Sequence, residues 1–292
     1  MNKNSISSEQ GTKYKMLSPK LDVVFQALFG EVGSEKITSR FLEAILNQKI
    51  ESIDLSKNPI LRREYPNDKL GILDIIVKLN KQEYCNIEMQ VAKREEIIER
   101  ILYYWGQIYT KQIKNGDNYE CLQKTIVILI ANFLVTGLED LEYHTCWKII
   151  EEKYRKTILT EKLEIRIIEL PKIVGFSNKD DELLDWLFFI ENPSSERVMK
   201  KMKENDELKQ ANEKLEQLSQ DEKMRRIAQW RYKAILEENT AKSAGYKEGN
   251  KDGIEKVAIE LLKKKCDFQF ISEVTKMTIE EIEKLNIKLE ND

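Results

Sequence analysis

Hydrophobic positions repeat at the spacing of one helical face in four segments of the first 192 residues. Apolar residues recur every three or four positions, which is the period of an amphipathic helix. The segments are 20–30, 34–49, 92–116 and 179–192. Ser34 precedes the second segment and is expected to cap it. The pattern therefore predicts four helices, two of them before any strand.

Between these helices, other segments have the spacing of strands. Residues 71–80 and 83–92 alternate between apolar and polar side chains, which predicts two half-buried neighbouring strands. The continuous apolar run at 124–133 predicts a buried central strand. A further strand is predicted at 161–170, where Pro171 stops it.

The pattern changes after Pro193. Residues 194–242 are highly charged, and Leu208, Leu215 and Leu218 form a patchy heptad seam. This seam predicts a solvated helix or a weak coiled coil, and from it a weak homodimer is expected. Further on, three glycines spaced four apart predict a mobile link before two or three short helices. The run "FISEVTKMTIEEIEKL" fits a helix-turn-helix or a small helical contact module.

These shifts in pattern predict four parts of the chain. They are a flexible leader at 1–16, a folded core at 17–192, a charged helical segment at 193–242 and a small helical tail at 243–292. A chain that ends near Asn192 is accordingly expected to keep the folded core.

Composition narrows the classes of function. Charged residues make up 34% of the 292 positions and hydrophobic residues 41%, and no apolar run reaches the length of a membrane span. The amino terminus lacks a signal-peptide pattern, so a cytoplasmic protein is expected, without a membrane partner. The formal charge of −3 does not favour nucleic acid, so contact with DNA requires a local basic patch. The single histidine and four scattered cysteines exclude histidine-rich metal sites within one chain.

Two acidic residues on the predicted strands carry the candidate chemistry. If the strands form a hairpin about Lys81, facing residue numbers add to 162, so Asp74 lies opposite Glu88. Like charges in that position repel, and a divalent cation between them reverses the effect. Gln90 shares the face of Glu88 and could orient water or a phosphate oxygen. The alternative is a mixed hairpin face turned to solvent.

The segment "DKLGILDIIVKLNKQEYCNIEMQ" resembles the acidic core of PD-(D/E)XK nucleases, in the variant whose last motif residue is glutamine. The segments "KLDVVFQALFG", "ERILYYWGQIYTKQIKNGDNYECLQKTIVILIANF" and "LEIRIIELPK" are similar, in the same order, to the Rpn family. That family comprises recombination-promoting nucleases and putative transposases. The resemblance runs from about residue 15 to residue 190.

The resemblance implies an α/β (α+β) fold, with an αβββαβ core, a mixed sheet flanked by helices and a helical C-terminal extension. It implies an endonuclease that uses Mg²⁺ to hydrolyse DNA phosphodiester bonds by a metal-activated water, without an organic cofactor. Asp74, Glu88 and the backbone carbonyl of Met89 match the metal-binding positions. Gln90 matches the position that most related enzymes fill with lysine, and Asp22 matches the acid of the first helix.

Departures from the family pattern keep a second interpretation open. Gln26 stands where many relatives carry lysine, and the motif lysine itself is absent, so Lys69 or Arg100 is a candidate to supply the missing positive charge. The alternative function is a catalytically weak descendant that serves as a DNA-binding or protein-interaction module.

Overall fold

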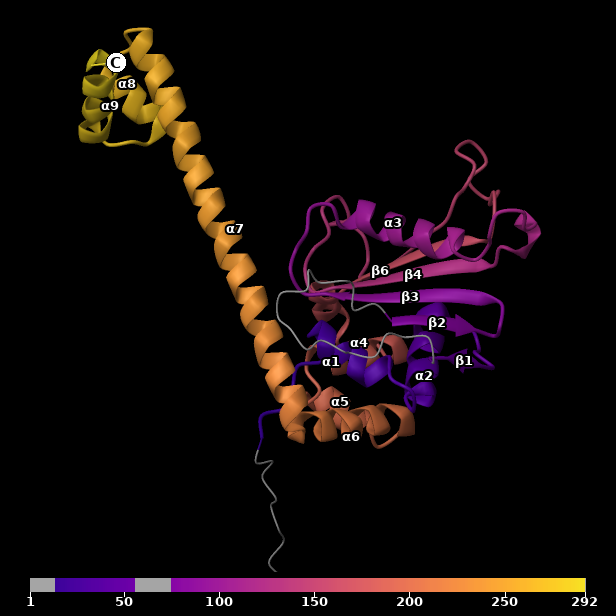
Figure 1. Cartoon of the computed structure of the whole chain (residues 1–292). Helices are drawn as coiled ribbons and strands as arrows, with labels where there is room; N and C mark the ends of the chain where they lie inside the picture. The colour runs from indigo at the N-terminus through magenta and orange to yellow at the C-terminus, as the bar shows by residue number, and fades with distance from the viewer. Residues whose placement is uncertain (1–13, 56–74, 292) are drawn as a thin grey trace, which may run out of the picture. The chain divides into compact units, whose positions relative to one another are not determined.

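The computed structural model describes residues 14–55 and 75–291. Within these residues, six strands form one mixed sheet in the order β1-β2-β3-β4-β6-β5 (Figure 1). The strands are β1 (Ile53–Asp54), β2 (Ile75–Leu79), β3 (Glu83–Gln90), β4 (Lys124–Ala131), β5 (His144–Trp147) and β6 (Leu163–Glu169). The parallel trio β3-β4-β6 forms the centre, and antiparallel strands flank it. The predicted mixed sheet is confirmed, whereas β5 had no clear sequence signal.

Helices cover both faces of the sheet. Figure 1 shows α3 (Ile97–Thr110) on one face and α1 (Asp22–Phe29), α2 (Glu35–Leu46) and α4 (Glu182–Glu191) on the other. The second face holds an aromatic cluster in which Phe29, Phe41 and Trp186 pack with ring centroids 4.8 to 6.2 Å apart. Each of these aromatic side chains is fully buried, so this layer anchors the core.

Two details of the predicted helices differ in the structure. The third helix is shorter than the predicted 92–116, and it begins at Ile97 and ends at Thr110. Ser34 precedes α2 but its side chain does not cap the helix. Its hydroxyl instead bonds the ammonium group of Lys214.

The β2–β3 hairpin has the register that the sequence predicts. Ile75 pairs with Ile87, and every further pair up to Leu79 and Glu83 also adds to 162. The turn contains no glycine, but Asn80 and Lys81 both adopt the left-handed conformation, with φ of 49° and 61°. Asparagine tolerates this conformation better than most residues, which allows a tight turn here. Asp74 itself lies outside the described residues.

The leucine seam of the charged segment packs within the chain. It lies on α6 (Asp206–Gln220), which follows α5 (Glu196–Lys201) and contacts α1 and α2. Leu208 and Leu215 are fully buried there. The seam is therefore part of the core of one chain, and it gives no support to a homodimer.

The chain divides into two compact units, residues 1–232 and 233–292. The boundary falls within α7 (Glu222–Lys263), and the sheet and α6 share the first unit, which extends beyond the predicted core boundary at residue 192. Gly245, Gly249 and Gly253 are helical rather than a link. Flanking lysine–glutamate pairs at helical spacing, such as Lys251 with Glu255, offset part of the cost of glycine.

The second unit is a small helical cluster. The end of α7 packs against α8 (Phe268–Thr275) and α9 (Ile279–Asn291) around Ala258, Leu262, Ile271 and Ile282. No helix in the described parts of the chain combines the length and apolar character needed to cross a membrane.

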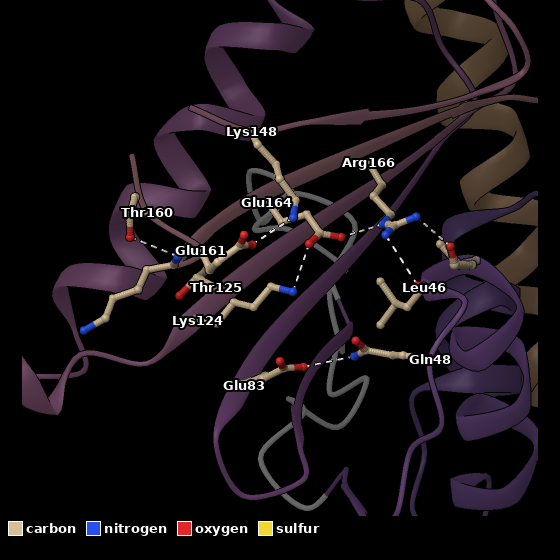
Figure 2. A network of polar contacts seen from close by, with 12 residues as sticks. Leu46, Gln48, Glu83, Lys124, Thr125, Lys148, Thr160, Glu161, Glu164 and Arg166 are labelled. Atoms are coloured by element: carbon tan, nitrogen blue, oxygen red, sulfur yellow. Dashed lines mark hydrogen bonds and ion pairs between the residues drawn. The ribbon is translucent and has the colours of Figure 1, made fainter. Parts of the chain in front are cut away.

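A buried polar network holds α2 against the start of the parallel strands (Figure 2). The carboxylate of Glu164 is bonded by Lys124 at 2.9 Å and by Arg166 at 2.6 Å. Burial alone would raise the pKa of Glu164, but these two cations lower it overall. Arg166 also donates to the carbonyl of Ile45 at 2.9 Å, in the last turn of α2. The network is structural, because each charge in it has a partner and it joins a helix end to the sheet.

His144 lies beside Arg166 of this network, and its position predicts that the protein loses stability in mild acid. Burial, and next the charge of Arg166 at 3.4 Å, lower the pKa of His144 from 6.5 to about 4. At a pH between these two values, His144 is protonated in the unfolded chain but neutral in the folded chain. The free energy of unfolding therefore falls as the pH falls from 6.5 to 4. We expect a loss of about 2 kcal/mol, after allowance for partial exposure. Urea unfolding across this pH range measures it.

His144→Gln is the matched variant for this effect, because it keeps a polar side chain that does not titrate. The slope of stability against pH between 6.5 and 4 should become shallower in this variant. Since the chain has one histidine, the signal of its imidazole Hε1 proton in an NMR titration reports the same pKa without overlap from another histidine. A signal that titrates near pH 6.5 would contradict the prediction.

Candidate active site

Strand β3 places three polar side chains on the face that α3 covers. Asn86, Glu88 and Gln90 alternate along the strand, and Glu88 pairs in register with Leu129 of β4. Leu129 packs in the same buried cluster as Ile101 of α3, which identifies the covered face. Asn86 and Glu88 are fully buried, and Gln90 at the strand end is partly exposed. These polar side chains thus follow β3 from its buried middle to its partly exposed C-terminal end.

Helix α3 supplies a cation to this face. The Nε atom of Arg100 lies 3.7 Å from Oε1 of Glu88. The guanidinium of Arg100 also lies over the ring of Tyr104, one helical turn later, at 5.1 Å from its centroid. A carboxylate with no exposed surface requires a counter-charge, because desolvation strongly disfavours its ionised form. Arg100 meets this requirement in the structure.

The backbone of Met89 is directed away from β4. The carbonyl of Gln90 accepts from Asn132 at 2.9 Å, so Gln90 makes its ladder bonds toward β4. Along a strand, neighbouring residues direct these groups to opposite sides. The Met89 carbonyl therefore points to the side of β2, whose described part begins at Ile75.

Asp22 has a different environment from Glu88. It lies in the first turn of α1, and Arg231 of α7 donates to both of its carboxylate oxygens at 2.5 to 2.8 Å. The two side chains are only 12% and 17% exposed. This two-pronged contact ties the start of α7 to α1 within the first compact unit. Nothing in the sequence indicated it, because the partners are 209 positions apart.

Gln26 lies close to the beginning of β2. It is 2% exposed, and its carbonyl accepts the amide of Gly30 at 2.7 Å. A Cβ atom at Gly30 would lie 3.0 Å from the Ile75 side chain and 3.2 Å from that of Gln26. The end of α1 is thus in close contact with the strand residue that follows Asp74 in the sequence.

The structure brings some of the predicted site residues together and leaves others apart. Glu88, Gln90 and the Met89 backbone occupy one strand end beside Arg100, whereas Asp22 pairs with Arg231. Asp74 and Lys69 lie outside the described residues. Among those residues, no group of three acidic, histidine or cysteine side chains is arranged to hold a metal. The structure adds buried Asn86 to this set of polar residues. Its position two residues before Glu88, on the same face of the strand, could have revealed it.

A mixed sheet between helices, with the acidic residue Glu88 near the end of a central strand, is consistent with a fold of the PD-(D/E)XK type. A model of the PD-(D/E)XK nuclease family transposases matches residues 19–245, and the chain belongs to that family. A search of curated proteins returns no match, and neither does a search of solved structures. The family supports a nuclease-type function with DNA as substrate, and PD-(D/E)XK nucleases generally use divalent metals.

Proposed function

We propose that this protein is a Mg²⁺-dependent DNA endonuclease that hydrolyses phosphodiester bonds with a metal-activated water. The observation that carries the proposal is the hairpin register, in which Ile75 faces Ile87. If the register continued by one residue, Asp74 would pair with buried Glu88. Because the chain belongs to a nuclease family, we expect this pair of carboxylates to lie in a nuclease active site.

The donor atoms of this site suit a hard cation. Carboxylate, amide and backbone carbonyl oxygens are the ligands that Mg²⁺ prefers, together with water and phosphate. Asp74, Glu88 and the Met89 carbonyl would hold the ion, since that carbonyl points toward β2. Bound there, Mg²⁺ supplies Lewis-acid chemistry, which lowers the pKa of water and offsets charge on the phosphate.

The remaining residues position and neutralise charge. Gln90 lies partly exposed at the strand end, where its amide can orient water or a phosphate oxygen without supplying a charge. Arg100, at 3.7 Å from Glu88, supplies a positive charge that most related enzymes take from the motif lysine.

The proposal is tested by nicking of supercoiled plasmid by the purified full chain. Nicking should require Mg²⁺, stop when EDTA removes the metal and return when Mg²⁺ is restored in excess. A Mg²⁺-dependent rise in melting temperature should accompany activity, because a ligand that binds only the folded state stabilises it. Activity that persists in EDTA would refute metal dependence.

A second prediction concerns Gln90 and Arg100. Gln90→Ala and Arg100→Gln should each lower the nicking rate roughly 10²-fold, the loss typical of one transition-state contact. If Arg100 supplies the missing charge, Gln90→Lys should restore much of the rate that Arg100→Gln removes. The initial rates of the single and double variants measure this compensation.

Lys111→Gln, at the exposed end of the same helix, is the control and should keep the wild-type rate. An unchanged rate in Gln90→Ala would show that its side chain is a bystander. Additive losses in the double variant would contradict the role assigned to Arg100.

Three observations favour the second candidate, a weakly active binding or interaction module. Glu88 is paired with Arg100, and Asp22 is paired with Arg231. Gln26 stands at a position where the family resemblance implies lysine. Such a protein would bind DNA and yet fail to nick plasmid at any Mg²⁺ concentration. A homodimer, which would place two active sites on a duplex, would need another surface than the leucine seam, and light scattering would detect it.

A further inference from the structure

A groove of about 440 Å³ lies in the second compact unit, between α7 and the α8–α9 pair. One wall is a face of α7, whose lining residues are spaced three or four apart from residue 247 to residue 255. The other wall is a face of α9 from residue 281 to residue 288, and the turn after α8 lies at its end. We call it the lysine groove, after its lining lysines: Lys247, Lys251, Lys276, Lys284 and Lys288.

The lysine groove is positive although its unit is not. Residues 233–292 contain eleven lysines and thirteen acidic residues, and neither arginine nor histidine. Two acids line the groove, and both are engaged locally. Glu281 accepts from the amide and hydroxyl of Thr278 at the start of α9, at 2.9 and 3.0 Å. Glu255 lies 3.9 Å from Lys251. The lining therefore has three more lysines than acids.

The groove lysines are accessible. All five are exposed, and within the described residues Lys251 alone among them lies within 4 Å of a carboxylate. Lys276 follows α8 in the left-handed conformation, with φ of 60°, which turns the chain toward α9. Concentrating charges of one sign in a groove raises the local potential above that of a flat surface with the same charges.

The spacing of the lysines matches a repeating polyanion. Lys247 and Lys251 are one helical turn apart on one wall, and Lys284 and Lys288 are one turn apart on the other, so each pair is separated by about 5–6 Å at Cβ. Lysine is a flexible point charge that contacts phosphate without imposing a fixed geometry. Such an arrangement suits a phosphate backbone rather than one small anion.

We propose that the lysine groove binds the phosphate backbone of DNA without reading its sequence. This inference rests on the proposed nuclease function and adds a second DNA contact outside the sheet. Base readout by α9 as a recognition helix does not fit, because that mode places the first helical turn at the base edges. In α9 this turn carries Glu280 and Glu281, which repel DNA.

The test compares two variants of the full chain with equal changes in charge. The groove variant is Lys247→Gln with Lys251→Gln, Lys284→Gln and Lys288→Gln. The control variant replaces four exposed lysines of the same unit outside the groove: Lys242→Gln, Lys256→Gln, Lys263→Gln and Lys264→Gln. The control includes part of "LLKKKC", the compact basic run of the tail. Melting temperatures of both variants should match that of the wild type, because these side chains are exposed.

Binding is measured by fluorescence anisotropy with a short labelled duplex in EDTA, so cleavage does not interfere. Each lost phosphate contact reduces the slope of log affinity against log salt by about 0.9. The groove variant should therefore lose about 3 to 4 from this slope and bind at least about tenfold more weakly in dilute salt. The control variant should keep the wild-type slope.

Three results would overturn the proposal. In the first, the groove variant binds DNA as tightly as the wild type does. In the second, the control variant loses as much DNA affinity as the groove variant, which would indicate an effect of bulk charge alone. Loss of binding to vesicles of anionic phospholipid, with DNA binding unchanged, would assign the groove to a lipid surface instead. Each result is separable from failure of the nuclease proposal, because nicking that depends on Glu88 is measured independently.

Discussion

Replacement of Glu88 by glutamine should abolish Mg²⁺-dependent nicking while the protein stays folded. The substitution keeps the shape of a fully buried side chain but removes the charge that would bind the metal. Lewis-acid stabilisation is worth several kcal/mol, and each 1.4 kcal/mol is a factor of ten in rate, so we expect a loss of roughly 10³-fold or more. Plasmid nicking measures the rate, and the thermal shift with Mg²⁺ should disappear as well.

Glu83→Gln is the matched control for this prediction. Glu83 lies at the other end of the same strand, where it accepts from the amide of Gln48 at 3.1 Å. This variant should keep both nicking and the thermal shift. Asp74→Asn should reproduce the loss seen in Glu88→Gln if the two carboxylates share one metal. Equal nicking by wild type and Glu88→Gln would indicate another site or a contaminating nuclease.

A chain truncated after residue 192 should fail to fold stably, although the sequence pattern led us to expect a folded core. Val198, Leu208 and Leu215 are fully buried in the first compact unit. Loss of α5 would uncover α4, and loss of α6 would uncover the apolar surfaces of α1 and α2. Burial of three such side chains contributes roughly 5–8 kcal/mol, which is comparable to the whole stability of a typical domain. Circular dichroism during thermal unfolding measures the loss.

A chain that ends at residue 232 tests the same idea from the other side, because it keeps the complete first compact unit. It should unfold cooperatively and retain nicking. As a point test, Leu215→Ala should cost roughly 2–5 kcal/mol. In the full chain, Leu236→Ala, at a position with 48% exposure, should cost much less. A truncation after residue 192 that melts like the longer chain would contradict the role given to α6.

The Arg231 contact explains why Asp22 is a weaker catalytic candidate than Glu88. Both oxygens of Asp22 already accept from a guanidinium, so a metal there would have to displace a well-formed ion pair. Glu88, by contrast, faces Arg100 at 3.7 Å, a longer contact. The catalytic role predicted for Asp22, the acid of the first helix, therefore stays a prediction.

The sequence by itself determined the two strands of the β2–β3 hairpin and their register. Alternation of apolar and polar residues specified β2 and β3, because side chains two apart share a face and a slip of one residue would bury the wrong set. The continuous apolar run of β4 specified a central strand, because a strand that is covered on both faces buries every side chain. The resemblance of these motifs to PD-(D/E)XK nucleases then predicted the family that the comparison confirms.

Only the tertiary structure decided which distant residues meet. Arg100 reaches Glu88, Arg231 reaches Asp22, and the leucines of α6 pack on α1 and α2. A helical face in sequence shows that it must be buried, but not whether a partner chain or its own chain covers it. Likewise, the lysine groove arises because α9 folds back beside α7, which brings together lysines up to 41 positions apart (Lys247 and Lys288). Such contacts depend on how helices pack, and local spacing carries no record of that packing.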